Sequence, residues 1–323
     1  MTVSNAIRRP APSASGSDAK GLPNGRQAAR STPRRWRNLI WVLPAVLLLC
    51  VFCYLPLVQN LGFSLLKWDI YSGRQTFIGA DNYLKMVNDP IFWKSLLNNT
   101  LYAAISIVFQ VFGALVLAAL VEGLPSPRWR GALRAIYFVP SAISLTVAGL
   151  LFYFIYEPRM GILNAALETL GLGDFTQAWL GQENTAIFGI IAMSQWQGFG
   201  YCTLLFAVAL QRIPSELFEA ASIDGVGPVR RFFSISLPLV REMSSLMMIV
   251  TVSGAFQVFN EVMVMTTGGP NNSSQVLGTW LYRSGFVRND FGYAAAIATA
   301  VFVITLVLAV LQLRLAKRRR VEW

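Results

Sequence analysis

The stretch EAASIDG at residues 219–225, followed by ISLP at residues 235–238, is a polar segment set between two long apolar ones. Pro214 suits the first turn of a helix, and the acidic Glu216 complements the positive end of the helix dipole. Asp224-Gly225 is a turn signal, so the first helix should end there. Its small alanines would let a partner protein pack closely against it.

A second short helix is predicted directly after this turn. Pro228 can open it, and Ser236 can cap the next long helix. Two short helices that meet at Gly225 would form a compact knuckle, which we define as residues 211–238. An ordinary amphipathic connector lying on a membrane surface is the alternative reading of the same segment.

Composition places the chain in a lipid bilayer. Hydrophobic residues make up 54% of its 323 positions and charged residues only 13%, a balance that soluble domains of this size rarely show. The chain contains no histidine, which excludes imidazole zinc sites and Ser-His-Asp or Cys-His catalysis. We therefore expect neither catalytic residues nor a metal site.

The apolar segments predict an all-α integral membrane protein with six transmembrane helices. Each has the length of about 20 residues that a bilayer requires, and lipid offers the backbone no hydrogen-bond partner outside a helix. The fifth is the least apolar, and we expect it to face a cavity. The expected spans lie within residues 39–316, at 39–62, 97–121, 133–156, 186–210, 238–260 and 291–313.

Basic residues predict the orientation of these spans. With the N-terminus inside, the cytosolic pieces carry 20 of the 27 Lys and Arg residues and the outward loops carry 7, which places both termini in the cytoplasm. Residues 1–38 lack the apolar residues needed for a core, so we expect a disordered basic tail there and a second short basic tail at 317–323. A membrane-facing tail explains this charge without a nucleic-acid partner.

The spacing E-A-A, three residues, G, nine residues, I-x-L-P resembles the EAA loop of the membrane subunits of bacterial ATP-binding-cassette importers. Weaker resemblances support it: residues 77–83 resemble an F-x-G-L-x-N-Y stretch, with Ala80 replacing the leucine, and residues 266–270 resemble a T-x-G-G-P turn. Together these features are similar to the maltose-type and glycerol-phosphate-type sugar permeases. The resemblance implies a coupling loop that enters a cleft on an ATPase subunit, with motif residues Glu219, Ala220, Ala221, Asp224, Gly225, Ile235, Leu237 and Pro238.

The same resemblance implies the partners. They are a second homologous permease subunit, an ATPase dimer that binds ATP and Mg²⁺, an extracytoplasmic solute-binding protein and a sugar substrate. This chain has no G-x-x-x-x-G-K-[ST] phosphate loop, so it cannot power transport alone and should bind no cofactor itself. The expected location is the bacterial inner membrane.

Substrate contacts are expected where polar groups interrupt apolar helices. The densest such group is SQWQGFGY at residues 194–201, whose amides can bond hydroxyls and whose indole can stack on a sugar face. The alternative is that the glutamines tie helices together and the glycines permit close packing. Resemblance to the maltose-type family implies a candidate substrate path of Ser141, Ser194, Gln197, Gly198 and Gln257. Asn260, three positions past Gln257, is a further candidate.

Two rival functions are a self-contained secondary transporter and an integral-membrane enzyme. A proton- or sodium-coupled carrier should hold an ionisable residue within the membrane. The acids near the spans, among them Glu261, all fall at predicted span ends, where water should be within reach. This placement and the missing catalytic groups disfavour both rivals.

Reporter fusions test the predicted orientation. Fusions after Gly123, Arg230 and Arg318 should report the cytoplasm, and fusions near Gly79, Gly173 and Asn271 the exterior, because basic residues are retained inside. A cytoplasmic signal at Gly173 would overturn the six-span topology.

Overall fold

The computed structural model describes residues 34–69 and 71–317, which fall into two units, 1–52 and 53–323. The first unit contributes α1 (Arg34–Leu49), with Pro44 inside it. Most of the expected disordered tails lies outside the described residues, but two boundaries were wrong. Residues 34–38 already belong to α1, and Lys317 is the last residue of α16.

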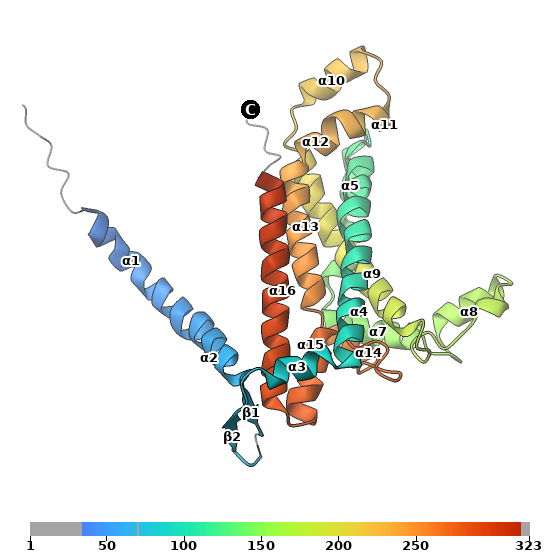
Figure 1. Ribbon diagram of the computed structural model, residues 1–323. Coiled ribbons are helices and arrows are strands. Elements are labelled where there is room, and N and C mark those ends of the chain that lie inside the picture. Colours follow the sequence, from blue (N-terminus) through green and yellow to red (C-terminus); the bar gives the residue numbers. More distant parts are fainter. Residues whose placement is uncertain (1–33, 70, 318–323) are drawn as a thin grey trace, which may run out of the picture. The chain divides into compact units, whose positions relative to one another are not determined.

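The second unit is built on long helices. They are α4 (Pro90–Ser106) continued through a π-helical segment (Ile107–Gly113) into α5 (Ala114–Glu122), α9 (Ala186–Leu210), α13 (Arg241–Phe256) and α16 (Phe291–Lys317). Shorter helices connect them: α2 (Leu55–Phe63), α3 (Asp81–Val87), α6 (Pro127–Phe138), α7 (Leu145–Ile155), α8 (Ile162–Thr169), α10 (Ser215–Ile223), α11 (Pro228–Arg231), α12 (Leu237–Leu239), α14 (Asn260–Met265) and α15 (Leu277–Tyr282). Within this unit, α10 and α11 lie at one end of the long helices, and α3, α14 and α15 at the other (Figure 1).

The all-α expectation needs one correction. Two short strands, β1 (Leu66–Trp68) and β2 (Gln75–Phe77), pair antiparallel with Leu66 opposite Phe77. Aromatic and β-branched residues here favour extended backbone over helix. The hairpin directly follows α2.

Three helices among the described residues are long and apolar enough to cross a membrane: Trp41–Phe63, Pro90–Glu122 and Phe291–Ala316. Each contains most or all of a predicted span. Two bent pairs raise the number to five if each pair counts as one span. The helix α9 has the predicted bounds 186–210 but does not join this set, because Ser194, Gln195 and Gln197 make it more polar.

The spans predicted at 133–156 and 238–260 are not single continuous helices, because each contains a sharp bend. The first is α6 and α7 at 92° to each other, with a 3₁₀ turn at Val139–Ala142 that contains Pro140. The second is bent by 72° between Leu239 and Arg241, next to Pro238, and α13 ends at Phe256. Proline removes a backbone donor and prevents regular helix from continuing, which accounts for a break near each proline.

The core consists of two apolar clusters. The larger joins α4, α9, α13, α15 and α16 around the fully buried Trp280, and the smaller joins α5, α9 and α13 around Phe206. Ala114 and Ala118 on α5 are completely buried and allow close approach of α9. Small residues at such contacts are typical of helix packing in membranes, where van der Waals contact drives association.

Irregular backbone between α13 and α15 is held by two adjacent amides on α4. Asn98 Nδ2 donates to the carbonyls of Ser273 (2.7 Å) and Gln275 (2.8 Å). Asn99 Nδ2 donates to the Ala255 carbonyl (2.6 Å), and its Oδ1 accepts from Leu277 N (2.8 Å). Both asparagines are buried. Their amides therefore supply hydrogen-bond partners to buried backbone groups that have no partner within a helix.

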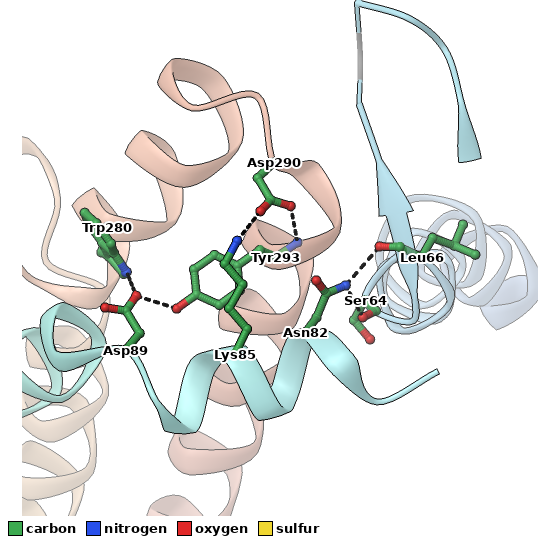
Figure 2. A network of polar contacts seen from close by, with 8 residues as sticks. All are labelled: Ser64, Leu66, Asn82, Lys85, Asp89, Trp280, Asp290 and Tyr293. Carbon is green, nitrogen blue, oxygen red and sulfur yellow. Dashed lines mark hydrogen bonds and ion pairs between the residues drawn. The ribbon is translucent and has the colours of Figure 1, made fainter. Parts of the chain in front are cut away.

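A second polar network joins the segment around α3 to α15 and α16 (Figure 2). Asp89 Oδ2 accepts from Trp280 Nε1 (2.9 Å) and from the Tyr293 hydroxyl (2.5 Å), and Lys85 pairs with Asp290. The Asp89 carboxylate also caps α4 through Ile91 N. One carboxylate thus fixes three helices at this end of the unit.

Asn82 anchors the start of α3 in the same network. Its Nδ2 donates to the carbonyls of Ser64 (2.8 Å) and Leu66 (2.9 Å). A Cβ at position 292 would lie 1.8 Å from the Leu66 carbonyl oxygen. Only glycine at this position lets α16 pack so closely against the backbone of Leu66. The residues quoted for the F-x-G-L-x-N-Y resemblance are therefore structural anchors here.

Replacing Asn99 tests the amide contacts. Asn99→Leu keeps the branching of the side chain but strands the Ala255 carbonyl and the Leu277 amide, and each buried unpaired group costs about 1–3 kcal/mol. We expect a clearly lower melting temperature of the full chain in detergent. Thr100→Val is the matched control, because the exposed Thr100 hydroxyl bonds only within its own helix. Equal melting of both variants would contradict the assignment.

Candidate functional site

The knuckle at residues 211–238 forms from two short helices, as predicted. At the end of α10 the Val226 amide donates to the Ala221 carbonyl (2.9 Å), and the Gly225 amide donates to the Ser222 carbonyl (3.1 Å). These two bonds make a Schellman motif, which requires a left-handed residue after the cap. Gly225 has φ 71°, which meets this requirement, and the helix ends at the predicted turn.

The surface of the knuckle combines acidic residues with exposed apolar side chains. Glu219, Ala220, Asp224 and Gly225 are exposed, whereas Ala221 is buried. Exposed large apolar residues on the same two helices and the turn that follows are Leu217, Ile223, Val229 and Phe233. A cluster of exposed apolar side chains such as this one favours contact between the knuckle and a protein partner.

The second half of the motif differs from the prediction. Phe232–Ser236 is a π-helical turn, and Ser236 is buried without a side-chain cap bond. Ser236 has helical backbone angles, whereas an N-cap residue needs an extended backbone, so it cannot cap α13. The sequence ISLP instead places the half-buried Ile235 and Leu237 and the exposed Pro238 before the 72° bend into α13.

A charged cluster fixes the helices beside the knuckle. Arg134 on α6 pairs with Glu122 at the end of α5, with Nε to Oε1 at 2.9 Å, and Gln211 at the end of α9 donates to Glu122 Oε2 (3.3 Å). The knuckle begins at Gln211. Its first residue is therefore tied to two other helices.

The predicted substrate-path residues of α9 are engaged with the bent pair α6–α7. The Ser141 hydroxyl donates to the Gln197 carbonyl (2.7 Å) and accepts from Tyr201 N (3.0 Å), and Gln197 Nε2 donates to the Ile143 carbonyl (3.0 Å). These bonds hold the break between α6 and α7 against α9. Ser141 and Gln197 thus lie together.

The glycines of this group serve close packing. A Cβ on Gly200 would lie 1.8 Å from the Tyr137 carbonyl oxygen, and a Cβ on Gly198 would lie 3.0 Å from Gln110 Nε2. Of the candidates, Gly198 thus faces a polar side chain of the π-helical segment in α4–α5.

A buried acid was missed by the sequence reasoning. Glu261 is only 4% exposed, and its Oε1 accepts from the Tyr102 hydroxyl (2.8 Å), with the Ser194 side chain close to the same hydroxyl. The expectation that water reaches Glu261 was wrong, because the break after Phe256 turns α14 into the bundle. A break inside a predicted span could not be read from its apolar pattern.

The last two candidates lie at this break. Gln257 and Asn260 are both exposed, Gln257 directly after α13 and Asn260 as the first residue of α14. The candidates therefore form three groups: Ser141, Gln197 and Gly198 at the α6–α7 bend, Ser194 at Tyr102, and the pair at the α13–α14 break.

Apolar helices with breaks satisfied inside the bundle, and an exposed two-helix knuckle at one end, define a membrane transport subunit. A family model described as "binding-protein-dependent transport system inner membrane component" matches residues 110–321. The chain belongs to this family. It is therefore the membrane-embedded permease component of an ATP-binding-cassette system, as the EAA spacing predicted.

Permease proteins of other bacteria are similar to this chain over nearly its whole length. A probable ABC transporter permease protein, YurN of Bacillus subtilis, is 46% identical over 283 residues, 88% of this chain and 97% of the relative. The diacetylchitobiose uptake system permease protein NgcF of Streptomyces coelicolor is 33% identical, covering 96% of this chain and 89% of the relative. The lactose transport system permease protein LacF of Rhizobium radiobacter is 31% identical, covering 90% and 99%.

A solved structure shares the fold. The crystal structure of a bacterial ABC transporter that imports the acidic polysaccharide alginate contains a chain with TM-score 0.77 and 21% identity, covering 88% of this chain and 96% of that one.

Gln197→Leu separates the structural role of this amide from a substrate role. The variant strands the Ile143 carbonyl at the α6–α7 bend, at a cost of about 1–3 kcal/mol. We expect a lower melting temperature of the full chain in detergent, with the exposed neighbour variant Tyr201→Phe unchanged. Unaltered melting of Gln197→Leu would leave the amide free for substrate.

Proposed function

We propose that this chain is the translocation subunit of an ATP-driven importer of a sugar or a related polyol or sugar derivative. Relatives named for lactose and diacetylchitobiose uptake support the substrate class. The proposed six crossings are the three apolar helices, the two bent pairs and α9. The basic-residue asymmetry supports placing both termini and the knuckle in the cytoplasm of a bacterial cell.

The knuckle carries this proposal as the element that couples transport to ATP hydrolysis. Its acid Glu219 is exposed on α10 one turn before the exposed apolar Ile223, so a cleft on an ATPase subunit can meet both a charge and an apolar surface. The Schellman turn at Gly225 fixes the angle between α10 and the next segment. A force on α10 is thereby passed to α12 and α13 as a rigid-body motion.

The proposed partners follow from this mechanism. An ATPase dimer supplies the energy and holds ATP and Mg²⁺, a second homologous permease subunit completes the pathway, and an extracytoplasmic binding protein delivers the sugar. A solved alginate transporter in complex with a periplasmic protein bound to alginate pentasaccharide supports the last of these by likeness of fold. Closure of the ATPase dimer would switch the pathway from inward-facing to outward-facing.

The proposed substrate path comprises Ser141, Ser194, Gln197, Gly198, Gln257 and Asn260. The exposed Gln257 and Asn260 at the α13–α14 break are the members with polar groups at the surface of this chain. Amide side chains both donate and accept hydrogen bonds, as sugar hydroxyls require. Ser194 lies near Tyr102, and Tyr102 in turn contacts the buried Glu261.

Substitutions in the knuckle test coupling. Gly225→Val forces a β-branched residue to φ 71°, at a cost of about 1–3 kcal/mol, while nothing lies within 4 Å of the new Cβ. Glu219→Lys reverses the exposed charge without changing the backbone. Both variants should reach the membrane at normal levels yet import sugar poorly and hydrolyse ATP without response to the binding protein.

Gly227→Ala is the matched control, since Gly227 has an ordinary extended backbone and open space around it. Wild-type uptake by both Gly225→Val and Glu219→Lys would remove the main support for coupling through this knuckle.

A further inference from the structure

Six aromatic side chains form a continuous row, which we call the aromatic ladder, at the end of the second unit that carries α14 and α15 (Figure 1). Each ring contacts the next, with centroid separations of 4.7, 5.7, 5.0, 5.2 and 5.6 Å along the row. The ladder runs from the end of α2 and β1, past the start of α16 and the π-helical turn after α15, to the α13–α14 break. In this order its members are Phe63, Trp68, Phe291, Phe286, Tyr282 and Phe259.

The rings of the ladder are incompletely covered by the protein. Phe286 is 60% exposed and Tyr282 is 37% exposed, and the other four rings are half-buried. A contiguous apolar surface of this kind marks a contact site for a ligand, a partner protein or lipid. The neighbouring side chains distinguish between these occupants.

Polar side chains beside the ladder argue against lipid. Gln257 and Asn260 lie on either side of Phe259 in the chain, and Arg283 follows Tyr282; all three polar residues are exposed. Hydrocarbon would remove water from these amides and from the charged guanidinium group, which is unfavourable. Aromatic belts at membrane interfaces are enriched in Trp and Tyr, whereas four of these six rings are Phe.

A saccharide matches the combination of rings and amides. The C–H face of a sugar ring can pack on an aromatic face, while its hydroxyls exchange hydrogen bonds with amide groups, which both donate and accept. Phenylalanine makes no directional hydrogen bond, so a sugar can move from one ring to the next. The amides of Gln257 and Asn260 can then hold it at the α13–α14 break.

We propose that the aromatic ladder is a saccharide track, on which sugar rings stack in turn as the substrate passes from the β1–β2 hairpin to Gln257 and Asn260. The proposal rests on the proposed sugar class and deepens it. It gives a substrate-guiding role to Tyr282 and Phe286, which lie outside the substrate path proposed above.

Binding of disaccharides to the full chain tests the track. The chain would be reconstituted in lipid nanodiscs without ATPase or binding protein and titrated with lactose, maltose and diacetylchitobiose, with selective saturation of aromatic protons in saturation-transfer NMR. At least one disaccharide should bind the wild type and receive saturation at its C–H protons. Phe286→Leu keeps an apolar side chain but removes the ring, and should weaken binding about threefold or more, the scale of one aromatic contact. Phe286→Tyr keeps the ring and should bind within about twofold of the wild type.

Phe175→Leu is the matched control, because Phe175 is a comparably exposed phenylalanine (64%) in the loop before α9 but takes no part in the ladder. Tyr282→Leu provides a second interruption of the ladder. Since Phe286 and Tyr282 are exposed, both leucine variants should fold, and an unchanged melting temperature would verify this. Absence of binding by all three disaccharides, wild-type binding by both ladder variants, or equal weakening by Phe175→Leu overturns the proposal.

The assay is independent of coupling. It contains no ATPase, so wild-type transport by the Glu219 and Gly225 variants would remove support from the knuckle without altering the disaccharide result. If the ladder variants bind disaccharide like the wild type but no longer crosslink to the extracytoplasmic binding protein, the ladder is a protein contact and the track proposal fails.

Discussion

The need to satisfy backbone groups away from water governs this structure. Regular helix satisfies its own donors and acceptors, but residues 257–276 leave and re-enter the helical bundle between α13 and α15. The side chain of Asn98 supplies two hydrogen bonds to that stretch, and the side chain of Asn99 supplies one to the end of α13 and one to the start of α15. Non-helical backbone at membrane depth is tolerated only where protein encloses it, and these amides provide the enclosure.

The same requirement explains why polar residues interrupt the apolar helices. Ser141 and Gln197 satisfy the bend between α6 and α7, and Tyr102 satisfies the acid on α14. Asp89 does so for α15 and α16 at their shared end (Figure 2). Each of these polar side chains therefore marks a place where a helix breaks or ends.

The sequence predicted the parts of the fold that depend on local chemistry. Apolar length located the helices at 41–63, 90–122 and 291–316, and Asp224-Gly225 predicted the turn at which Gly225 has a positive φ. The bends at Pro140 and Pro238 were missed, because an apolar run reads as one span whether it is straight or bent. The burial of Glu261 was also missed, since it depends on a break that turns α14 inward and on Tyr102, 159 residues away along the chain.

The polarity of α9 has a consequence for assembly of the protein in the membrane. A helix carrying Ser194, Gln195 and Gln197 enters lipid poorly by itself, since each polar group would lose water without gaining a partner. Its partners, Ser106 on α4 and the Ile143 carbonyl before α7, are both synthesised earlier than α9. Insertion of the fourth apolar segment is thus a cooperative event that needs the preceding helices already in place. In a chain shortened before α9, the groups that bond α9 would be present without their partner helix.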